Sequence, residues 1–277
     1  MTPRRLKTAL LISSLLAALA LGEGKTYGSG PFQQVNSYTI YYGEATPERM
    51  AQLKRKNLVI IEPHQFTAGQ IQEIRKAGTL VIGYLSVMES PVWNQARMTK
   101  LQAGDYLLNN GQKIRFAEWN SYLMDLRSRH YRTVLLEEIR SSIAGKGLDG
   151  IFLDTVGDMD DRLTDQKVQT EIRQAYRGFL QETSTKFPAL TLIQNRGFDT
   201  LPYSLPYLDG FLWEDWRSTW KQNEWMKQRV QQLQLAQQGG LKVFSVSTRK
   251  DAGAAKAASQ LNYVHLDAAG GYLNKIN

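Results

Sequence analysis

Gly150-Ile151-Phe152-Leu153-Asp154 is the stretch of the chain that decides the fold. It is a short apolar run that ends on an acid, and such a run is typical of a strand in a parallel sheet, which is buried on both faces. Similar runs lie at Leu58–Ile61, 80–85, 190–195 and 210–214. Between these runs the apolar residues recur with helical spacing. The pattern therefore predicts parallel strands that are covered by helices.

A closed barrel needs eight such strands, and the sequence supplies a candidate for each. The remaining candidates are residues 38–42, residues 242–246, and either 263–266 or 271–273. Eight strand-helix units in about 240 residues favour an α/β fold of the single (β/α)8 TIM-barrel type. An open, doubly wound parallel sheet is the structural alternative.

The N-terminal residues have the pattern of an export signal. Arg4, Arg5 and Lys7 precede an uncharged apolar stretch, which is shorter than the ~20 residues needed to span a bilayer. We therefore predict a signal peptide at residues 1–22, a Gly-rich flexible leader at 23–37 and one barrel domain at 38–277. The protein would be secreted or periplasmic, with no membrane span after signal cleavage.

The composition excludes several classes of site and partner. The chain has no cysteine, so disulfides, thiolate metal sites and cysteine nucleophiles are excluded. Removal of the three basic signal residues lowers the net charge from +8 to +5 (8 − 3), and the remaining charges are interspersed. Nucleic-acid binding would require a clustered basic stripe, so no nucleic-acid partner is expected. No histidine has zinc-site spacing, so no metal or cofactor is predicted, and we expect a monomer.

One connection is much longer than the others. About forty residues, among them Trp93, Trp119 and Tyr122, separate the third strand from the helix that begins near Arg127, and long loops in compact domains are often functional. In a barrel, a loop that follows a strand lies on the active face. This loop is therefore expected to contribute to the site.

The polar residues that end the predicted strands are the candidates for chemistry, because barrel active sites lie at the C-terminal ends of the strands. The second strand ends at Glu62, the fourth at Asp154, the fifth at Asn195 and the sixth at Glu214. Carboxyl groups with aromatic neighbours suit glycosidic bond cleavage. In that reaction one carboxyl group protonates the leaving oxygen, and the other acts as nucleophile or as base for a water molecule.

We predict Asp154 and Glu214 as the catalytic pair. Glu214 would be the general acid, because apolar neighbours keep a carboxyl group protonated. Aromatic faces stack on sugar rings and polar tips bind hydroxyl groups. The expected substrate contacts are Glu62, Tyr84, Trp93, Trp119, Asn195, Trp213 and Trp216.

Each candidate also has a structural alternative. A single aspartate after a strand is often a turn or helix-cap residue, and that interpretation is favoured for Asp158, Asp160 and Asp161. An Asp-x-Asp pair could instead hold a metal ion, which would fit a metal-dependent deacetylase or phosphodiesterase. For Trp213 and Trp216, core packing is as well supported as substrate stacking.

The motifs around these residues resemble those of glycoside hydrolase family 114. The principal match is Gly145-Lys-Gly-Leu-Asp-Gly-Ile-Phe-Leu-Asp-Thr-Val-Gly-Asp158, and residues 83–87, 122–127, 193–195 and 209–214 resemble further family segments in order and spacing. The sequence departs from the family pattern at Met88, where a glycine is expected, and at Arg196-Gly197, where a proline is common. Both departures lie near the substrate groove.

The resemblance implies a (β/α)8 barrel with Asp154 and Glu214 as its two catalytic carboxyl groups. The family includes endo-α-1,4-polygalactosaminidases, so the resemblance implies a secreted enzyme that cleaves within a polysaccharide, such as one that contains galactosamine. The alternative is a non-catalytic carbohydrate-binding envelope protein on the same barrel, since a fold does not fix a function.

Overall fold

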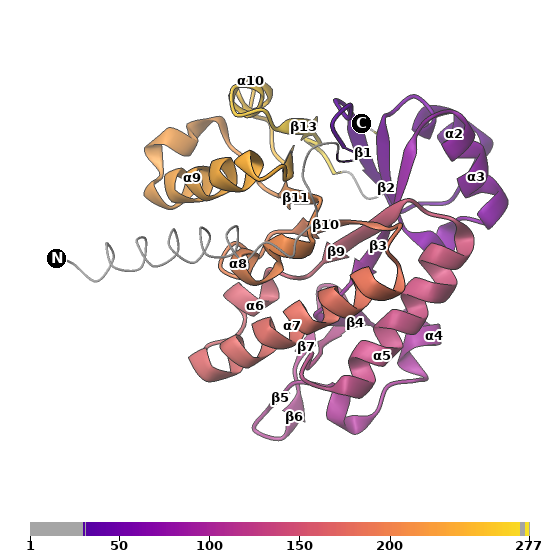
Figure 1. Ribbon diagram of the computed structural model, residues 1–277, viewed down its shortest axis with the longest axis vertical. Coiled ribbons are helices and arrows are strands. Elements are labelled where there is room, and N and C mark those ends of the chain that lie inside the picture. Colours follow the sequence, from indigo (N-terminus) through magenta and orange to yellow (C-terminus); the bar gives the residue numbers. More distant parts are fainter. Residues whose placement is uncertain (1–29, 31, 272–274, 277) are drawn as a thin grey trace.

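The computed structural model describes residues 30, 32–271 and 275–276. The predicted signal peptide at residues 1–22 lies outside the described residues. Eight parallel strands form the central sheet in the order β1-β2-β3-β9-β10-β11-β12-β13. β1 lies beside β13, so the sheet forms a nearly closed barrel with helices between its strands (Figure 1). The predicted TIM-barrel fold is confirmed.

The barrel strands agree closely with the predicted runs. They are β1 (Tyr38–Tyr41), β2 (Leu58–Ile61), β3 (Leu80–Ser86), β9 (Gly150–Asp154), β10 (Thr191–Asn195), β11 (Gly210–Trp213), β12 (Lys242–Ser247) and β13 (Val264–Asp267). The eighth strand is therefore the first of the two predicted candidates. The second candidate, residues 271–273, lies almost entirely outside the described residues.

The helices cover the outside of the barrel. They are α2 (Pro47–Leu53), α3 (Ala68–Lys76), α4 (Gln95–Met98), α5 (Arg129–Glu138), α6 (Asp158–Asp161), α7 (Gln166–Lys186), α8 (Leu201–Ser204), α9 (Glu224–Gln238) and α10 (Ala254–Ser259). Sequence signals fix several of their starts: Thr67 and Gln70 form a capping box at α3, and the Asp165 side chain caps α7. No helix in the described part of the chain is long and apolar enough to cross a membrane.

Side chains alternate between two cores along each strand, as the pleat requires. Phe152, Ile193 and Leu212 point into the barrel and pack with one another. Their neighbours Leu153 and Phe211 point outward and pack against the helices. The last inward position of each strand therefore lies at the C-terminal mouth of the barrel.

The N-terminal end of the barrel is closed by the segment that precedes β1. Phe32 and Val35 are almost fully buried, and the Phe32 ring meets Phe244 edge to face at 5.8 Å. Asn57 Oδ1 accepts hydrogen bonds from the backbone N–H groups of Asn36 and Ser37. The prediction of a flexible leader is wrong for residues 32–37, because their two apolar side chains bury themselves in the barrel. Residues 23–29 and 31 lie outside the described range.

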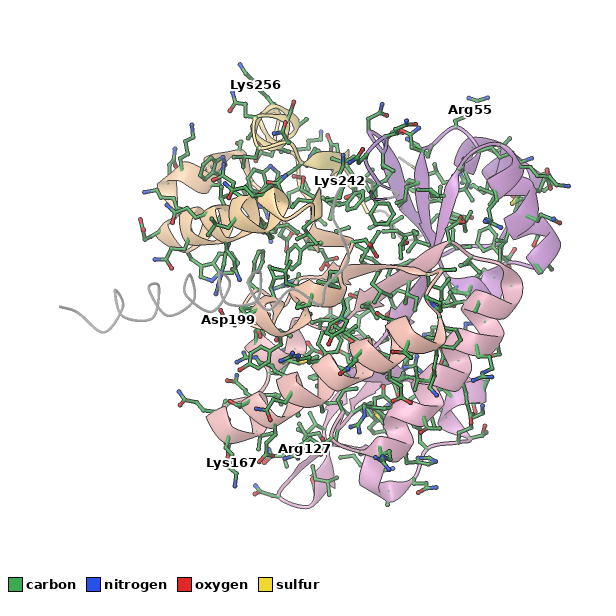
Figure 2. All side chains as sticks on the ribbon, viewed as in Figure 1. Arg55, Arg127, Lys167, Asp199, Lys242 and Lys256 are labelled. Atoms are coloured by element: carbon green, nitrogen blue, oxygen red, sulfur yellow. The ribbon has the colours of Figure 1, made fainter. Side chains whose placement is uncertain are left out.

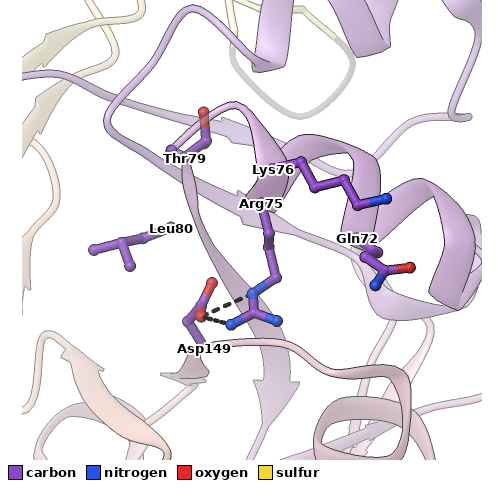
Figure 3. Close-up of a pocket in the computed structure, with 7 residues that line it drawn as sticks. Gln72, Arg75, Lys76, Thr79, Leu80 and Asp149 are labelled. Carbon is purple, nitrogen blue, oxygen red and sulfur yellow. Dashed lines mark hydrogen bonds and ion pairs between the residues drawn. The ribbon is translucent and has the colours of Figure 1, made fainter.

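The same N-terminal end has a small polar pocket of about 440 Å³ (Figure 3). Arg75 forms an ion pair with Asp149 there at 2.7 Å, and the second oxygen of Asp149 accepts a hydrogen bond from the Val81 N–H. These contacts join α3 to the starts of β3 and β9. Residues at this end of a TIM barrel serve stability rather than chemistry.

The long connection after β3 forms its own small structure. It contains β4 (Glu89–Pro91), β5 (Leu108–Asn109), β6 (Gln112–Lys113), β7 (Arg115–Phe116) and β8 (Ser121–Leu123). β4, β8 and β7 form one antiparallel sheet, and β5 pairs with β6. The buried Arg97 guanidinium fixes this unit, because it pairs with Glu138 of α5 at 2.7 Å and donates to the carbonyl groups of Ser86 and Glu89.

Charged side chains extend outward at several edges of the molecule (Figure 2). Lys167 on α7 and Lys256 on α10 lie at opposite edges of the view, with Arg55 on a third side (Figure 2). This placement matches the interspersed charge pattern in the sequence.

Candidate active site

A cleft of about 790 Å³ opens at the C-terminal mouth of the barrel. Three inward-facing residues line it. Asp154 and Asn195 end β9 and β10, and Glu214 directly follows β11. The other expected residues that line this cleft are Glu62, Tyr84, Trp93 and Trp119. Seven of the nine predicted site residues are therefore brought together in one place.

Asp154 is held by its neighbour on the next strand. Asn195 Nδ2 donates a hydrogen bond of 2.7 Å to Asp154 Oδ1. Asn195 is only 4% exposed, and its Oδ1 has no hydrogen-bond partner among the described residues. The Asn195 amide group therefore fixes the orientation of the Asp154 carboxyl group.

Two tyrosines face the site carboxyl groups from inside the barrel. Burial raises the pKa of Tyr84 well above its usual value, and the nearby charge of Asp154 adds to the effect. Burial likewise raises the pKa of Tyr38, with a smaller contribution from Glu214. Tyr38 donates its hydroxyl proton to the Ser245 carbonyl oxygen at 2.7 Å. Both phenols therefore remain neutral donors below the negatively charged mouth.

Exposed aromatic rings form one wall of the cleft. Trp93 and Trp119 are 54% and 57% exposed, and both come from the long connection after β3. The Trp93 ring meets His64 edge to face at 5.7 Å. His64 Nδ1 lies 2.6 Å from Glu62 Oε1, and this hydrogen bond raises the pKa of His64. The prediction that the long loop contributes to this face is confirmed.

Trp213 and Trp216 do not line the cleft, so their expected contact with substrate is wrong. Both are buried, with their rings 5.0 Å apart, and Trp216 Nε1 donates to the Ala254 carbonyl oxygen. The reason lies in the pleat: Glu214 points into the mouth, so the preceding Trp213 must point outward, toward the helices. Their role is core packing, the alternative that the sequence supported equally well.

Asp158 was assigned to a loop or cap, but it also lines the cleft, where it meets Glu89. Burial and the contact with Glu89 raise the pKa of Asp158 to about 8. Glu89 is 8% exposed and forms a short hydrogen bond with the Ser121 hydroxyl group. Two carboxyl groups in contact retain a proton between them, because both cannot ionise cheaply. Glu89 follows the third predicted strand in the sequence, but no sequence pattern indicates this pairing.

The other two acids of that segment have different surroundings. Asp160 is a structural acid, with contacts to Arg173 and the Thr200 hydroxyl group at 2.8 and 2.7 Å. Asp161 lines the cleft and pairs with Arg196 at 3.0 Å. Among the described residues there is no cluster of three His, Cys, Asp or Glu side chains that could hold a metal ion.

The cleft has a strongly negative lining. Six carboxyl groups and two guanidinium groups belong to it, and because Asp158 and Glu89 retain one proton between them, the excess is three negative charges (6 − 1 − 2). The carboxyl groups are those of Glu62, Glu89, Asp154, Asp158, Asp161 and Glu214, and the guanidinium groups are those of Arg162 and Arg196. The local charge is thus opposite in sign to the net charge of the protein.

Comparisons with known proteins agree with this geometry. The sequence model of "Glycoside-hydrolase family GH114" matches residues 23–271. No curated protein matches the sequence.

Among solved structures, the glycoside hydrolase domain of PelA from Pseudomonas aeruginosa superposes with a TM-score of 0.72 at 21% identity, over 88% of this chain and 98% of that one. Ega3 from Aspergillus fumigatus, solved in complex with galactosamine, gives 0.65 at 15% identity, over 91% and 99%. The maltogenic α-amylase AmyB from Thermotoga neapolitana gives 0.55 at 12% identity, over 87% and 69%. At these identities, the likeness to solved structures establishes the fold.

Proposed function

The chain belongs to glycoside hydrolase family GH114, and we propose that it cleaves within a galactosamine-containing polysaccharide, with Asp154 and Glu214 as its catalytic carboxyl groups. One observation carries this proposal. Asp154 ends β9 and Glu214 follows β11, on either side of β10, and both line the same cleft as the exposed rings of Trp93 and Trp119. That arrangement supplies two carboxyl groups for the reaction and aromatic faces for the sugar rings.

The contacts of Asp154 suit the role of nucleophile or base. Asp154 accepts the hydrogen bond from Asn195, which fixes the direction of its carboxyl oxygens. Glu214 is then the residue that donates a proton to the leaving glycosidic oxygen. Neutral Tyr84, close to Asp154, is placed to donate a hydrogen bond to a sugar hydroxyl group.

The charge of the cleft supports a cationic substrate. A deacetylated galactosamine polymer carries one ammonium group per sugar at neutral pH. The net charge of +8 gives such a polymer no long-range attraction, but the negative lining of the cleft provides it locally. The structural neighbour Ega3, which was solved with galactosamine, points to the same class of sugar.

Export belongs to the same proposal. The basic start and short apolar stretch within residues 1–22 would direct the chain out of the cytoplasm, to an extracellular or periplasmic polysaccharide. Cleavage of the N-terminus during secretion, detected by mass spectrometry of the exported protein, is the expected result.

The test is hydrolysis of deacetylated α-1,4-linked galactosamine polymer, with its N-acetylated form and a neutral galactan beside it. Asp154→Asn and Glu214→Gln should each abolish cleavage but preserve folding and polymer binding. Glu182→Gln, at an exposed acid that pairs only with Lys186 of the same helix, is the matched control and should be fully active. Full activity in either cleft variant would remove that residue from the mechanism.

Two further outcomes discriminate among the possibilities. Binding without cleavage by the unmodified protein would favour the non-catalytic carbohydrate-binding alternative. If cleavage occurs, NMR of the freshly released reducing end identifies the anomer. Retention assigns Asp154 as nucleophile, whereas inversion assigns it as base for a water molecule.

A further inference from the structure

Asp154, Asn195 and Glu214 lie at the C-terminal ends of three neighbouring strands, β9, β10 and β11. All three ends share an unusual backbone feature. The residue directly after each of them has a positive φ: 63° at Thr155, 54° at Arg196 and 56° at Asp215. Such a conformation is uncommon for any residue other than glycine, and asparagine is one of the residues that tolerate it best.

The feature is specific to the site. Only three other non-glycine residues in the described part of the chain have positive φ, and all three are asparagines: Asn110, Asn120 and Asn262. Thr155 and Arg196, which tolerate positive φ less well than asparagine or aspartate, both directly follow a site side chain. Strain of this kind persists only where surrounding contacts hold it, and it clusters at functional sites.

Thr155 is the most demanding of the three, because its β-branched side chain makes the left-handed region especially unfavourable. Its hydroxyl group explains how the conformation is held. Thr155 Oγ1 accepts hydrogen bonds from the Met88 and Val87 N–H groups at 2.8 and 3.1 Å, and it donates to the Asp154 carbonyl oxygen at 2.6 Å. The Asp154 carbonyl oxygen also accepts a bond from Val87 N–H at 3.0 Å.

These bonds join the end of β9 to the chain that leaves β3. Val87 and Met88 lead directly to Glu89. The Thr155 hydroxyl group therefore fixes the backbone next to Asp154 and also the backbone next to Glu89, and both of these acids line the cleft. From the other side, Arg97 donates to the carbonyl oxygens of Ser86 and Glu89. The segment 86–89 is therefore clamped between a guanidinium group and a hydroxyl group.

The corresponding contacts at the other two strands are weaker. Arg196 reaches Asp161 at 3.0 Å, and Asp215 accepts a bond from the Thr248 hydroxyl group at 2.6 Å, but the side chains of Asp161 and Asp215 are both more than half exposed. Solvent competes for such exposed contacts. Thr155 is the member of the set whose contacts depend least on the surface.

We propose that Thr155 is a positioning residue of this enzyme: its left-handed turn and its hydroxyl group hold the Asp154 carboxylate against Asn195 and in line with the sugar. The inference rests on the proposed catalytic role of Asp154. Thr155 acts through Asp154 and through the segment 86–89.

Three variants of Thr155 separate the contribution of its hydroxyl group to kcat from the contributions of its side-chain shape and its backbone strain. Thr155→Ser keeps the hydroxyl group and should keep kcat within about twofold. Thr155→Val keeps the shape but leaves the Met88 N–H group without its acceptor and removes one of the two acceptors of the Val87 N–H group. Thr155→Gly relieves the backbone strain but also lacks the hydroxyl group. In both, kcat should fall about 10- to 100-fold while KM changes less than about threefold, because positioning affects the reacting geometry more than ground-state binding.

The matched control is Asn262→Gly, which changes another residue with positive φ (57°) that does not line the cleft. It should leave kcat unchanged. Thr155→Gly keeps the test valid if Thr155→Val fails to fold, since glycine accepts this φ without strain. Rates are compared per folded molecule, with folding measured by circular dichroism.

Full kcat in Thr155→Gly, or a loss in Thr155→Ser as large as in Thr155→Val, would overturn the proposal. Its failure is distinct from failure of the catalytic assignment. If Asp154→Asn is inactive while Thr155→Gly is fully active, only the positioning role is refuted. If Asp154→Asn is active, the catalytic assignment itself falls.

Discussion

Replacement of Asn195 by alanine tests the electrostatic arrangement at Asp154 most directly. The Asn195 side chain donates one hydrogen bond, of 2.7 Å, to the Asp154 carboxylate, and it does so from a position that is 4% exposed. The variant removes that donor and leaves the carboxylate in place. The Asp154 carboxylate then loses the contact that fixes its orientation, so the rate of hydrolysis should fall.

The size of the effect follows from the type of bond. A hydrogen bond to a charged group contributes about 1.5–3 kcal/mol to stability. A tenfold change in rate corresponds to about 1.4 kcal/mol. Loss of this contribution from the transition state should therefore lower kcat/KM about 10- to 150-fold.

The assay is the rate of release of reducing ends from galactosamine oligomers, measured as kcat and KM per folded molecule. Asn57→Ala is the matched control, because Asn57 accepts hydrogen bonds from the Asn36 and Ser37 backbone N–H groups at the opposite end of the barrel. It should lower stability without lowering kcat/KM. An unchanged kcat/KM in Asn195→Ala would refute the reasoning.

Three other changes have defined outcomes. Trp93→Ala should raise KM about 2- to 13-fold, since aromatic contacts contribute about 0.5–1.5 kcal/mol. Trp225→Ala, the control at a half-exposed ring outside the cleft, should leave KM unchanged. Equal effects of the two variants on KM would contradict a stacking role for Trp93. Because the pKa of Asp158 is raised to about 8 by burial and by Glu89, the folded state binds more protons than the unfolded one between about pH 4 and pH 8, so the free energy of unfolding should fall as pH rises through that window. Urea titrations of Asp158→Asn should show a smaller fall, and an unchanged slope would contradict the pairing. Phe32→Ala should lower the free energy of unfolding by about 3–5 kcal/mol, and a loss below about 1 kcal/mol would mean that this ring does not close the barrel.

The fold could be predicted because its strands are buried on both faces. Each barrel strand is a short apolar run, and the runs at Leu58–Ile61 and Gly150–Asp154 coincide with β2 and β9 at both ends. The strands of the long connection were missed, because segments of two or three residues, such as β5 and β6, have no periodic signal. The closure of the barrel by Phe32 was also missed, since two apolar residues in a Gly-rich stretch do not reveal what they bury against.

The part of the site that lies at the ends of the barrel strands could be predicted from the sequence. Parallel strands bring their C-terminal ends to one edge, so Asp154, Asn195 and Glu214 were expected together. The same geometry should have excluded Trp213, because two consecutive residues of a strand cannot face the same side. The contact between Glu89 and Asp158 joins two loops, and loop conformation does not follow from periodicity.

The left-handed conformation of Thr155 could not be predicted from its residue type. A left-handed residue is foreseen where glycine or asparagine stands, because those residues accept positive φ at little cost. Threonine gives the opposite signal, and its conformation here depends on N–H groups of Val87 and Met88 that another strand supplies. The features that hold the candidate nucleophile in place are therefore tertiary, and they become visible only once β3 and β9 lie side by side. A local sequence preference that is overridden directly after a strand-end acid is itself evidence of function, since a fold selected for stability alone would have no reason to retain the strain.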